Sequence, residues 1–118
     1  MGDARLEVIA AIKELIQANL SARQQLEENE RLLRSALAGI EAGASIEATL
    51  RAMPTTEERA ANTEAVRSFY ERRIDVRTAT IKAALDEGMT VSDLAAVFGI
   101  PHAVIASHVA RSAVESDP

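Results

Sequence analysis

The sequence predicts an all-α protein, in which two long N-terminal helices, forming a coiled coil or a helical hairpin, precede a pair of short C-terminal helices. Alanine, the strongest helix former, supplies 23 of the 118 residues. Aromatic residues, which favour strands, make up only 3% of the chain. Neither glycine nor proline, the two residues that interrupt helices, occurs in residues 4–38 or 55–87.

Residues 4–38 predict one continuous helix that presents a seam to a partner helix. Apolar and small residues alternate along it at steps of four and three, as in a coiled coil. A capping box at residues 21–24 leaves open a break near Leu20, with a new helix starting at Ser21. On the seam we assign to dimerisation Val8, Ile12, Leu15, Asn19, Leu26 and Leu33. The seam also contains Ala22, Asn29, Ala36 and Ile40.

The second half of the chain begins with a short helix and continues with a second long one. A helix over residues 46–53 ends before Pro54, because the residue that precedes a proline disfavours the helical conformation. Thr55 and Glu58 have capping-box spacing at the start of the long helix, and Gly88 is placed as its C-cap. The two long helices can fold back as a hairpin or pair between chains, and the sequence leaves both open.

After the second long helix the sequence predicts two short helices joined by a tight turn. Thr90 is a typical N-cap, and Asp93 follows at a position where the helix dipole favours negative charge. Gly99 ends this helix, and Pro101 suits the start of the next, which extends to about residue 113. A helix of about eight residues, a turn with glycine and a helix of about ten form a helix-turn-helix.

Residues 88–111 resemble the helix-turn-helix DNA-binding domains of prokaryotes, including those of site-specific invertases and resolvases. Ala95 is small where the second helix crosses, and Gly99 can adopt the left-handed conformation of the turn. The resemblance implies that the second helix enters the major groove of DNA. His108 stands where the family usually has an apolar core residue. The outward residues that can donate or accept hydrogen bonds to DNA are His102, Ser107 and Arg111, and the others are Pro101, Ala103, Ala106 and Ala110.

A basic cluster precedes this motif. Residues 66–82 carry five basic side chains and two acidic ones. In helix-turn-helix domains the preceding helix often contacts the DNA backbone, so we assign phosphate binding to Arg72, Arg73 and Arg77. The alternative is that these arginines pair with Glu71, with Asp75 or with the acidic run Glu27, Glu28 and Glu30.

Composition and spacing argue against several other classes of protein. The chain has no cysteine, which excludes a disulfide scaffold, a cysteine-ligated metal site and thiol catalysis. His102 and His108 are six residues apart and therefore do not form the metal-binding pair of a helix, so we expect no metal and no cofactor. No phosphate-binding glycine loop or activated nucleophile is evident, and we expect neither an enzyme nor a small-molecule substrate. No apolar run is longer than that of residues 8–12, so we expect no membrane span and a cytoplasmic location.

The leading hypothesis is a DNA-binding protein, sequence-specific or architectural, that acts as a dimeric transcriptional regulator. Residues 1–87 form its dimerisation or hairpin unit and residues 88–118 its helix-turn-helix. The formal net charge of −5 is unusual for a nucleic-acid binder. The alternative hypothesis is therefore a helical adaptor, such as a phage or plasmid accessory protein or an antitoxin, whose helix-turn-helix does not bind DNA.

Overall fold

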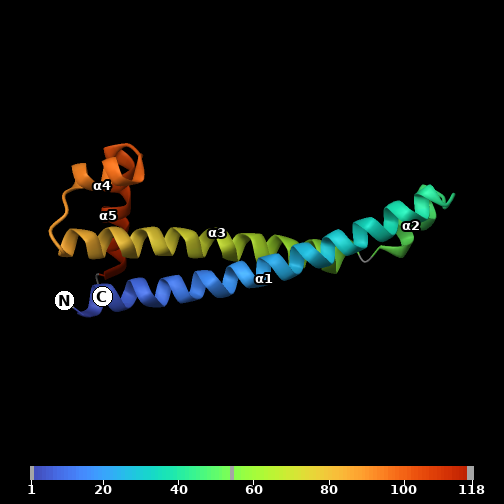
Figure 1. Cartoon of the computed structure of the whole chain (residues 1–118), viewed down its shortest axis with the longest axis horizontal. Coiled ribbons are helices and arrows are strands. Elements are labelled where there is room, and N and C mark those ends of the chain that lie inside the picture. The colour runs from blue at the N-terminus through green and yellow to red at the C-terminus, as the bar shows by residue number, and fades with distance from the viewer. Residues whose placement is uncertain (1, 54, 117–118) are drawn as a thin grey trace. The chain divides into compact units, whose positions relative to one another are not determined.

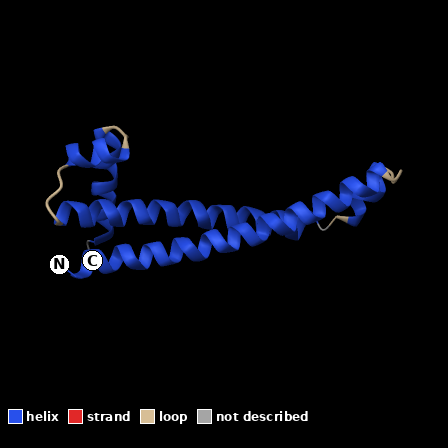
Figure 2. Ribbon diagram, in the orientation of Figure 1, coloured by secondary structure: helices blue, strands red, loops and turns tan. Residues whose placement is uncertain are grey.

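The computed structural model describes the backbone of residues 2–53 and 55–116 and the side chains of residues 2–53 and 56–110. Over these ranges the chain forms helices joined by turns and contains no strand (Figure 2), which confirms the all-α class. In chain order (Figure 1) the helices are α1 (Gly2–Glu41), α2 (Ile46–Ala52), α3 (Thr55–Asp86), α4 (Val91–Phe98) and α5 (His102–Ser116).

The chain divides into two compact units, to which both long helices contribute. One, which we call the terminal unit, contains residues 1–16 and 71–118, and the other, the middle unit, contains residues 17–70. The prediction that the first helix is continuous is confirmed, because α1 passes through Ser21 without interruption. The two short C-terminal helices thus belong to the same unit as one end of each long helix.

In the middle unit, segments of α1 and α3 run in opposite directions as a hairpin (Figure 1). Gln25 Nε2 donates a hydrogen bond of 2.7 Å to Glu58 Oε1. Asn62 Nδ2 donates one of 3.2 Å to Asn29 Oδ1. These bonds show that the two helices pair within one chain, the first of the two arrangements that the sequence left open.

Helix α2 lies in the middle unit beside the end of α1 and is delimited by local signals. Its N-cap is Ser45, whose hydroxyl accepts the Ala48 N–H at 3.1 Å. It ends at Ala52, because Met53 precedes Pro54 and is extended, with φ −86° and ψ 130°. The predicted cap at Thr55 lies outside the described side chains.

In the terminal unit, three ion pairs join the start of α1 to the end of α3 in antiparallel order. Arg5 lies 2.7 Å from Glu87, Lys82 lies 3.3 Å from Glu7, and Arg72 lies 3.6 Å from Glu14. In each pair at least one side chain is more than half exposed, so solvent screens the pair and it contributes little to stability. Stability in this unit comes instead from an apolar core that joins α3, α4 and α5. Its buried residues are Ile81, Leu94, Ala95 and Ile105.

The inward-facing row of α1 keeps the predicted period but differs in phase. Steps of four and three recur, but every second position lies one residue earlier than predicted. The buried or half-buried residues are Ala4, Val8, Ala11, Leu15, Ala18, Ala22, Gln25, Asn29, Leu32, Ala36 and Gly39. Five of the ten predicted seam positions thus face inward, and the other five are exposed: Ile12, Asn19, Leu26, Leu33 and Ile40. Small inward side chains explain the shift, because they allow the backbones of paired helices to approach more closely than Ile or Leu would.

Candidate nucleic-acid interface

Helices α4 and α5 form a bent pair joined by a short turn at Gly99. Their axes change direction by 116° at the turn, which falls within the range typical of a helix-turn-helix. Gly99 makes the turn in the left-handed conformation, with φ 66°, and its N–H bonds the Ala95 carbonyl. Leu94 on α4 and Ile105 on α5 are buried together against Ile81 of α3. One side of α5 is thereby fixed against the protein, which leaves the other side to solvent.

The N-terminal cap of α4 is the predicted capping box. The Asp93 N–H donates to Thr90 Oγ1 at 3.0 Å, and the Thr90 N–H donates to Asp93 Oδ2 at 2.9 Å. Two hydrogen bonds from Thr90 hold the pKa of Asp93 below its ordinary value. The bond from the backbone N–H has the larger effect, and the bond from the side chain has the smaller one. At the preceding junction the Gly88 N–H bonds the Leu85 carbonyl at 3.1 Å, and Gly88 has φ 105°, as expected for a C-cap. The position of α4 is therefore defined by sequence signals at both of its ends.

The outward side of α5 is accessible over its described part. His102 and Ser107, the two predicted hydrogen-bonding residues that can be placed there, are both exposed. Arg111, the third, lies outside the described side chains. The remaining outward residues Pro101, Ala103, Ala106 and Ala110 are exposed as well. This surface is open to a ligand, but it offers few groups that could read a base pair.

His108, the departure from the helix-turn-helix pattern, lies at the contact between α5 and α3. Its Nδ1 is 3.2 Å from Oγ1 of Thr78, which is buried, and His108 itself is half-buried. The polar side chain is therefore accommodated by a hydrogen bond across the two helices. Neither residue was predicted as a partner of the other, because 30 positions separate them in sequence.

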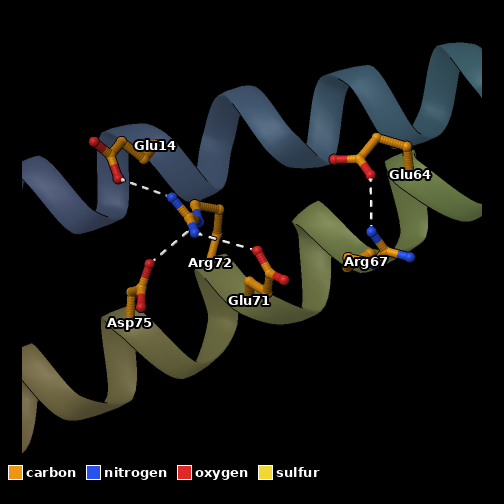
Figure 3. A network of polar contacts seen from close by, with 6 residues as sticks. All are labelled: Glu14, Glu64, Arg67, Glu71, Arg72 and Asp75. Carbon is orange, nitrogen blue, oxygen red and sulfur yellow. Dashed lines mark hydrogen bonds and ion pairs between the residues drawn. The ribbon is translucent and has the colours of Figure 1, made fainter.

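Arg72, predicted to contact phosphate, is held by carboxylates of its own chain (Figure 3). Its Nε lies 3.2 Å from Asp75, and its terminal nitrogens lie 3.6 Å from Glu71 and 3.6 Å from Glu14. Its side chain is only 33% exposed. For Arg72 the alternative of pairing with Glu71 and Asp75 is thus the arrangement found, and Glu14 is a partner that the sequence did not suggest.

The other members of the basic cluster include two side chains in ion pairs and two that differ in exposure. Lys82 pairs with Glu7, and Arg67 lies 3.3 Å from Glu64 within α3 (Figure 3). Arg73 is exposed and Arg77 is half-exposed. Arg73 is thus the most exposed of the three arginines in the predicted phosphate-binding set.

The predicted dimerisation residues fall into two groups. Val8 and Leu15 are half-buried in the terminal unit. Ile12, Asn19, Leu26 and Leu33 are exposed, although three of them are large and apolar. Sequence reasoning did not separate the two groups, because both recur with the same period.

Shallow grooves occur in both units, but neither contains a cluster of reactive groups. The groove of the terminal unit, about 250 Å³, is lined by Arg5, Val8, Ile9, Thr80, Ala83, Ala84 and Glu87. The groove of the middle unit, about 210 Å³, lies between α1 and α2. No group of three or more His, Asp or Glu side chains that could hold a metal ion occurs among the described residues.

Comparisons of the chain with protein-family models, with curated proteins and with solved structures find no match. No single helix in the described ranges is long and apolar enough to cross a membrane. Only α4 and α5 together reach that length and hydropathy, across their 116° bend.

Proposed function

We propose that this protein binds duplex DNA as a dimer through the outward side of α5 and acts as a transcriptional regulator or an architectural protein. The observation that carries the proposal is the 116° pair of α4 and α5, in which Ile105 is buried while Ala106 and Ser107 are exposed. A recognition helix needs this division, because one side must be fixed to the protein and the other must fit the major groove.

Binding would depend more on shape and phosphate contacts than on base-edge contacts. The outward side of α5 has small side chains that permit close approach, with His102 and Ser107 as hydrogen-bonding groups. Arg73 and Arg77 would supply phosphate contacts. With a net charge of −5, the chain gains little long-range attraction to DNA, so two modules in one dimer are needed for useful affinity.

The test is a fluorescence anisotropy titration of the protein on fragmented genomic DNA at about 50 mM salt. We expect saturable binding at micromolar protein. Ala106→Glu places a negative charge on the outward side of α5 and should abolish binding. Ala38→Glu, which adds the same charge at an exposed position of α1, should bind as the wild type does. No binding by the wild type, or equal binding by both variants, would overturn the proposal.

The arginines are tested through the salt dependence of binding. The double variant Arg73→Ala/Arg77→Ala should bind more weakly, and its slope of log K against log salt should be shallower by about 0.9 for each lost phosphate contact. The matched control is Arg31→Ala/Arg51→Ala, which removes two charges from α1 and α2, where they pair with Glu28 and Glu47. Equal slopes for the two double variants would exclude Arg73 and Arg77 as phosphate contacts.

A second candidate function, that of an adaptor, is favoured by one observation on the same hairpin. Val97 of α4 is 72% exposed, and three of the outward residues of α5, Ala103, Ala106 and Ala110, are alanines. An apolar, uncharged surface of this kind suits a protein partner better than it suits DNA. If the wild type does not bind DNA, and a protein that co-purifies with it is lost on Val97→Asp, the adaptor function is supported instead.

A further inference from the structure

Most large apolar side chains of the middle unit are exposed, and its inward side chains are mostly small or polar, with Leu32 and Phe69 as half-buried exceptions. Its buried apolar residues among those described are Ala18 and Ala22. The inward positions that follow include Gln25 and Asn29, which bond Glu58 and Asn62 across the hairpin. One oxygen of this polar layer, Asn62 Oδ1, is buried without a hydrogen-bond donor. A unit with this interior lacks the apolar core that normally stabilises a fold of its size.

The missing apolar residues form a stripe along the exposed surface of the same unit. Each residue of the stripe directly follows an inward-facing one, as Leu26 follows Gln25 and Val66 follows Ala65. The stripe consists of Leu26 (52% exposed), Leu33 (53%), Leu37 (56%), Ile40 (39%), Val66 (40%) and Tyr70 (57%).

These six residues lie on one side of the hairpin. A helix turns by 100° per residue in a fixed sense about its own axis. In two antiparallel helices, the positions that come one residue after the inward ones therefore point to the same side of the pair. Helix α2 does not cover this side. The groove between α1 and α2 is lined by the inward residues Leu32 and Ala36 and by Ser35, which lies on the other side of α1 from the stripe.

We propose that a second copy of this chain covers the stripe and that the two hairpins form a four-helix bundle. Six side chains that are about half exposed leave roughly 600 Å² on each copy, approaching the ~800 Å² per partner of a standard interface. The stripe repeats with heptad spacing, which is the spacing at which helices of a bundle interlock.

The charges beside the stripe suit a copy of the same surface. Arg23, Glu27, Glu30 and Arg34 are exposed on α1, two of each sign, so the surface does not repel itself. Two antiparallel copies of α1 that cross near residue 32 bring Leu26 of one beside Leu37 of the other. The same crossing brings Glu30 of one beside Arg34 of the other. The interface is thus self-complementary, as a twofold dimer requires.

The inference concerns the dimer on which the proposed function rests, and it is tested without DNA. The first measurement is the mass in solution by light scattering. We expect twice the chain mass of 12.7 kDa for the wild type and a single chain mass for Leu33→Glu. Leu50→Glu, on α2 at a similar exposure of 57%, should leave the mass of the dimer unchanged.

A second measurement does not depend on whether Leu33→Glu still folds. The chain has no cysteine, so a single introduced thiol reports one position. Leu33→Cys, near the crossing point, should oxidise to a disulfide-linked dimer at least about tenfold faster than Ser35→Cys, which lies on the other side of α1, because only close pairs can be bridged.

A wild type that is monomeric at about 100 μM, or a dimer in which the two thiols link at equal rates, would overturn the inference. Its failure is distinguishable from that of the proposed function. A monomer that binds DNA contradicts the bundle and the dimeric form of the regulator but leaves DNA binding by α5 standing. A cross-linking dimer that does not bind DNA contradicts the DNA-binding function alone.

Discussion

At the residue scale, the pair Thr90 and Asp93 gives α4 a measurable dependence on pH. The Thr90 N–H and hydroxyl hold the pKa of Asp93 below its ordinary value of 3.8. The ionised cap therefore contributes stability above the pKa of the unfolded state, and this contribution is lost as the pH falls through the lower pKa of the folded state. We expect Asp93→Asn to reduce the loss of stability between about pH 5 and pH 2, measured as the urea midpoint at each pH. An unchanged pH dependence in the variant would show that the cap does not contribute.

The contacts of Thr90, Asp93 and Arg72 show which side-chain pairs can be predicted from the sequence and which cannot. The partners Thr90 and Asp93 are three positions apart, so spacing alone identifies the bond between them. Arg72 also has a neighbour on its own helix, Asp75, which the sequence offered as one of several alternatives. Its third partner, Glu14, comes from another helix, and no local pattern indicates which arginine it meets. Contacts between distant parts of the chain depend on how the helices align, which local spacing does not determine.

At the element scale, the turn between α4 and α5 depends on the conformational freedom of Gly99. At φ 66° a residue with a side chain is strained. The strain comes from the backbone conformation and not from a clash, because an added Cβ there meets no atom within 4 Å. We expect Gly99→Ala to lower the free energy of unfolding by about 1–2 kcal/mol, and Gly99→Asn to lower it less, because Asn tolerates the left-handed region. The measurement is chemical denaturation followed by circular dichroism.

Gly39 is the control for this prediction. It lies inside α1, where an added Cβ would make only an ordinary contact with Ala44. Gly39→Ala should raise the free energy of unfolding by about 0.5–1 kcal/mol, because alanine favours the helix. A loss of stability of similar size in both alanine variants would show that the left-handed turn is not the cause.

The elements themselves were largely predictable, and the phase of the long hairpin was not. Capping residues and glycines mark the ends of α2 and α4, and an uninterrupted run of helix formers marks α1. On α1, two neighbouring rows recur with the same heptad period, one rich in alanine and the other in Ile and Leu. Hydrophobicity favours the second row as the inward one. In the structure the alanine row faces inward, because closeness of approach also decides how helices pair.

At the scale of the whole molecule, the proposed dimer predicts a stability that depends on concentration. Folding coupled to association becomes more favourable as the protein concentration rises. Between about 1 and 100 μM we expect the melting temperature to rise by roughly 5 °C. Leu33→Glu should melt at one temperature over the same range. A melting temperature of the wild type that does not change with concentration would contradict coupling between folding and association.

The proposed function follows from the shape of α4 and α5 rather than from the charge of the surface. A basic surface would have identified DNA as the partner, but Arg72 and Lys82 are paired with carboxylates within the chain. The proposal therefore depends on the shape of α4 and α5, and small helical hairpins of this shape also occur in proteins that do not bind DNA. The titration on DNA distinguishes the DNA-binding function from the adaptor function.

The ion pair between Arg5 and Glu87 joins residues 82 positions apart, whereas the turn at Gly99 closes within a few residues. Because the entropy lost on closing a loop grows with its length, the pair of short helices can form early and the start of α1 docks last. During synthesis, which proceeds from the N-terminus, α1 leaves the ribosome well before the end of α3 exists to receive it. We therefore expect the residues of α1 that are translated first to be the last to dock in the folded chain.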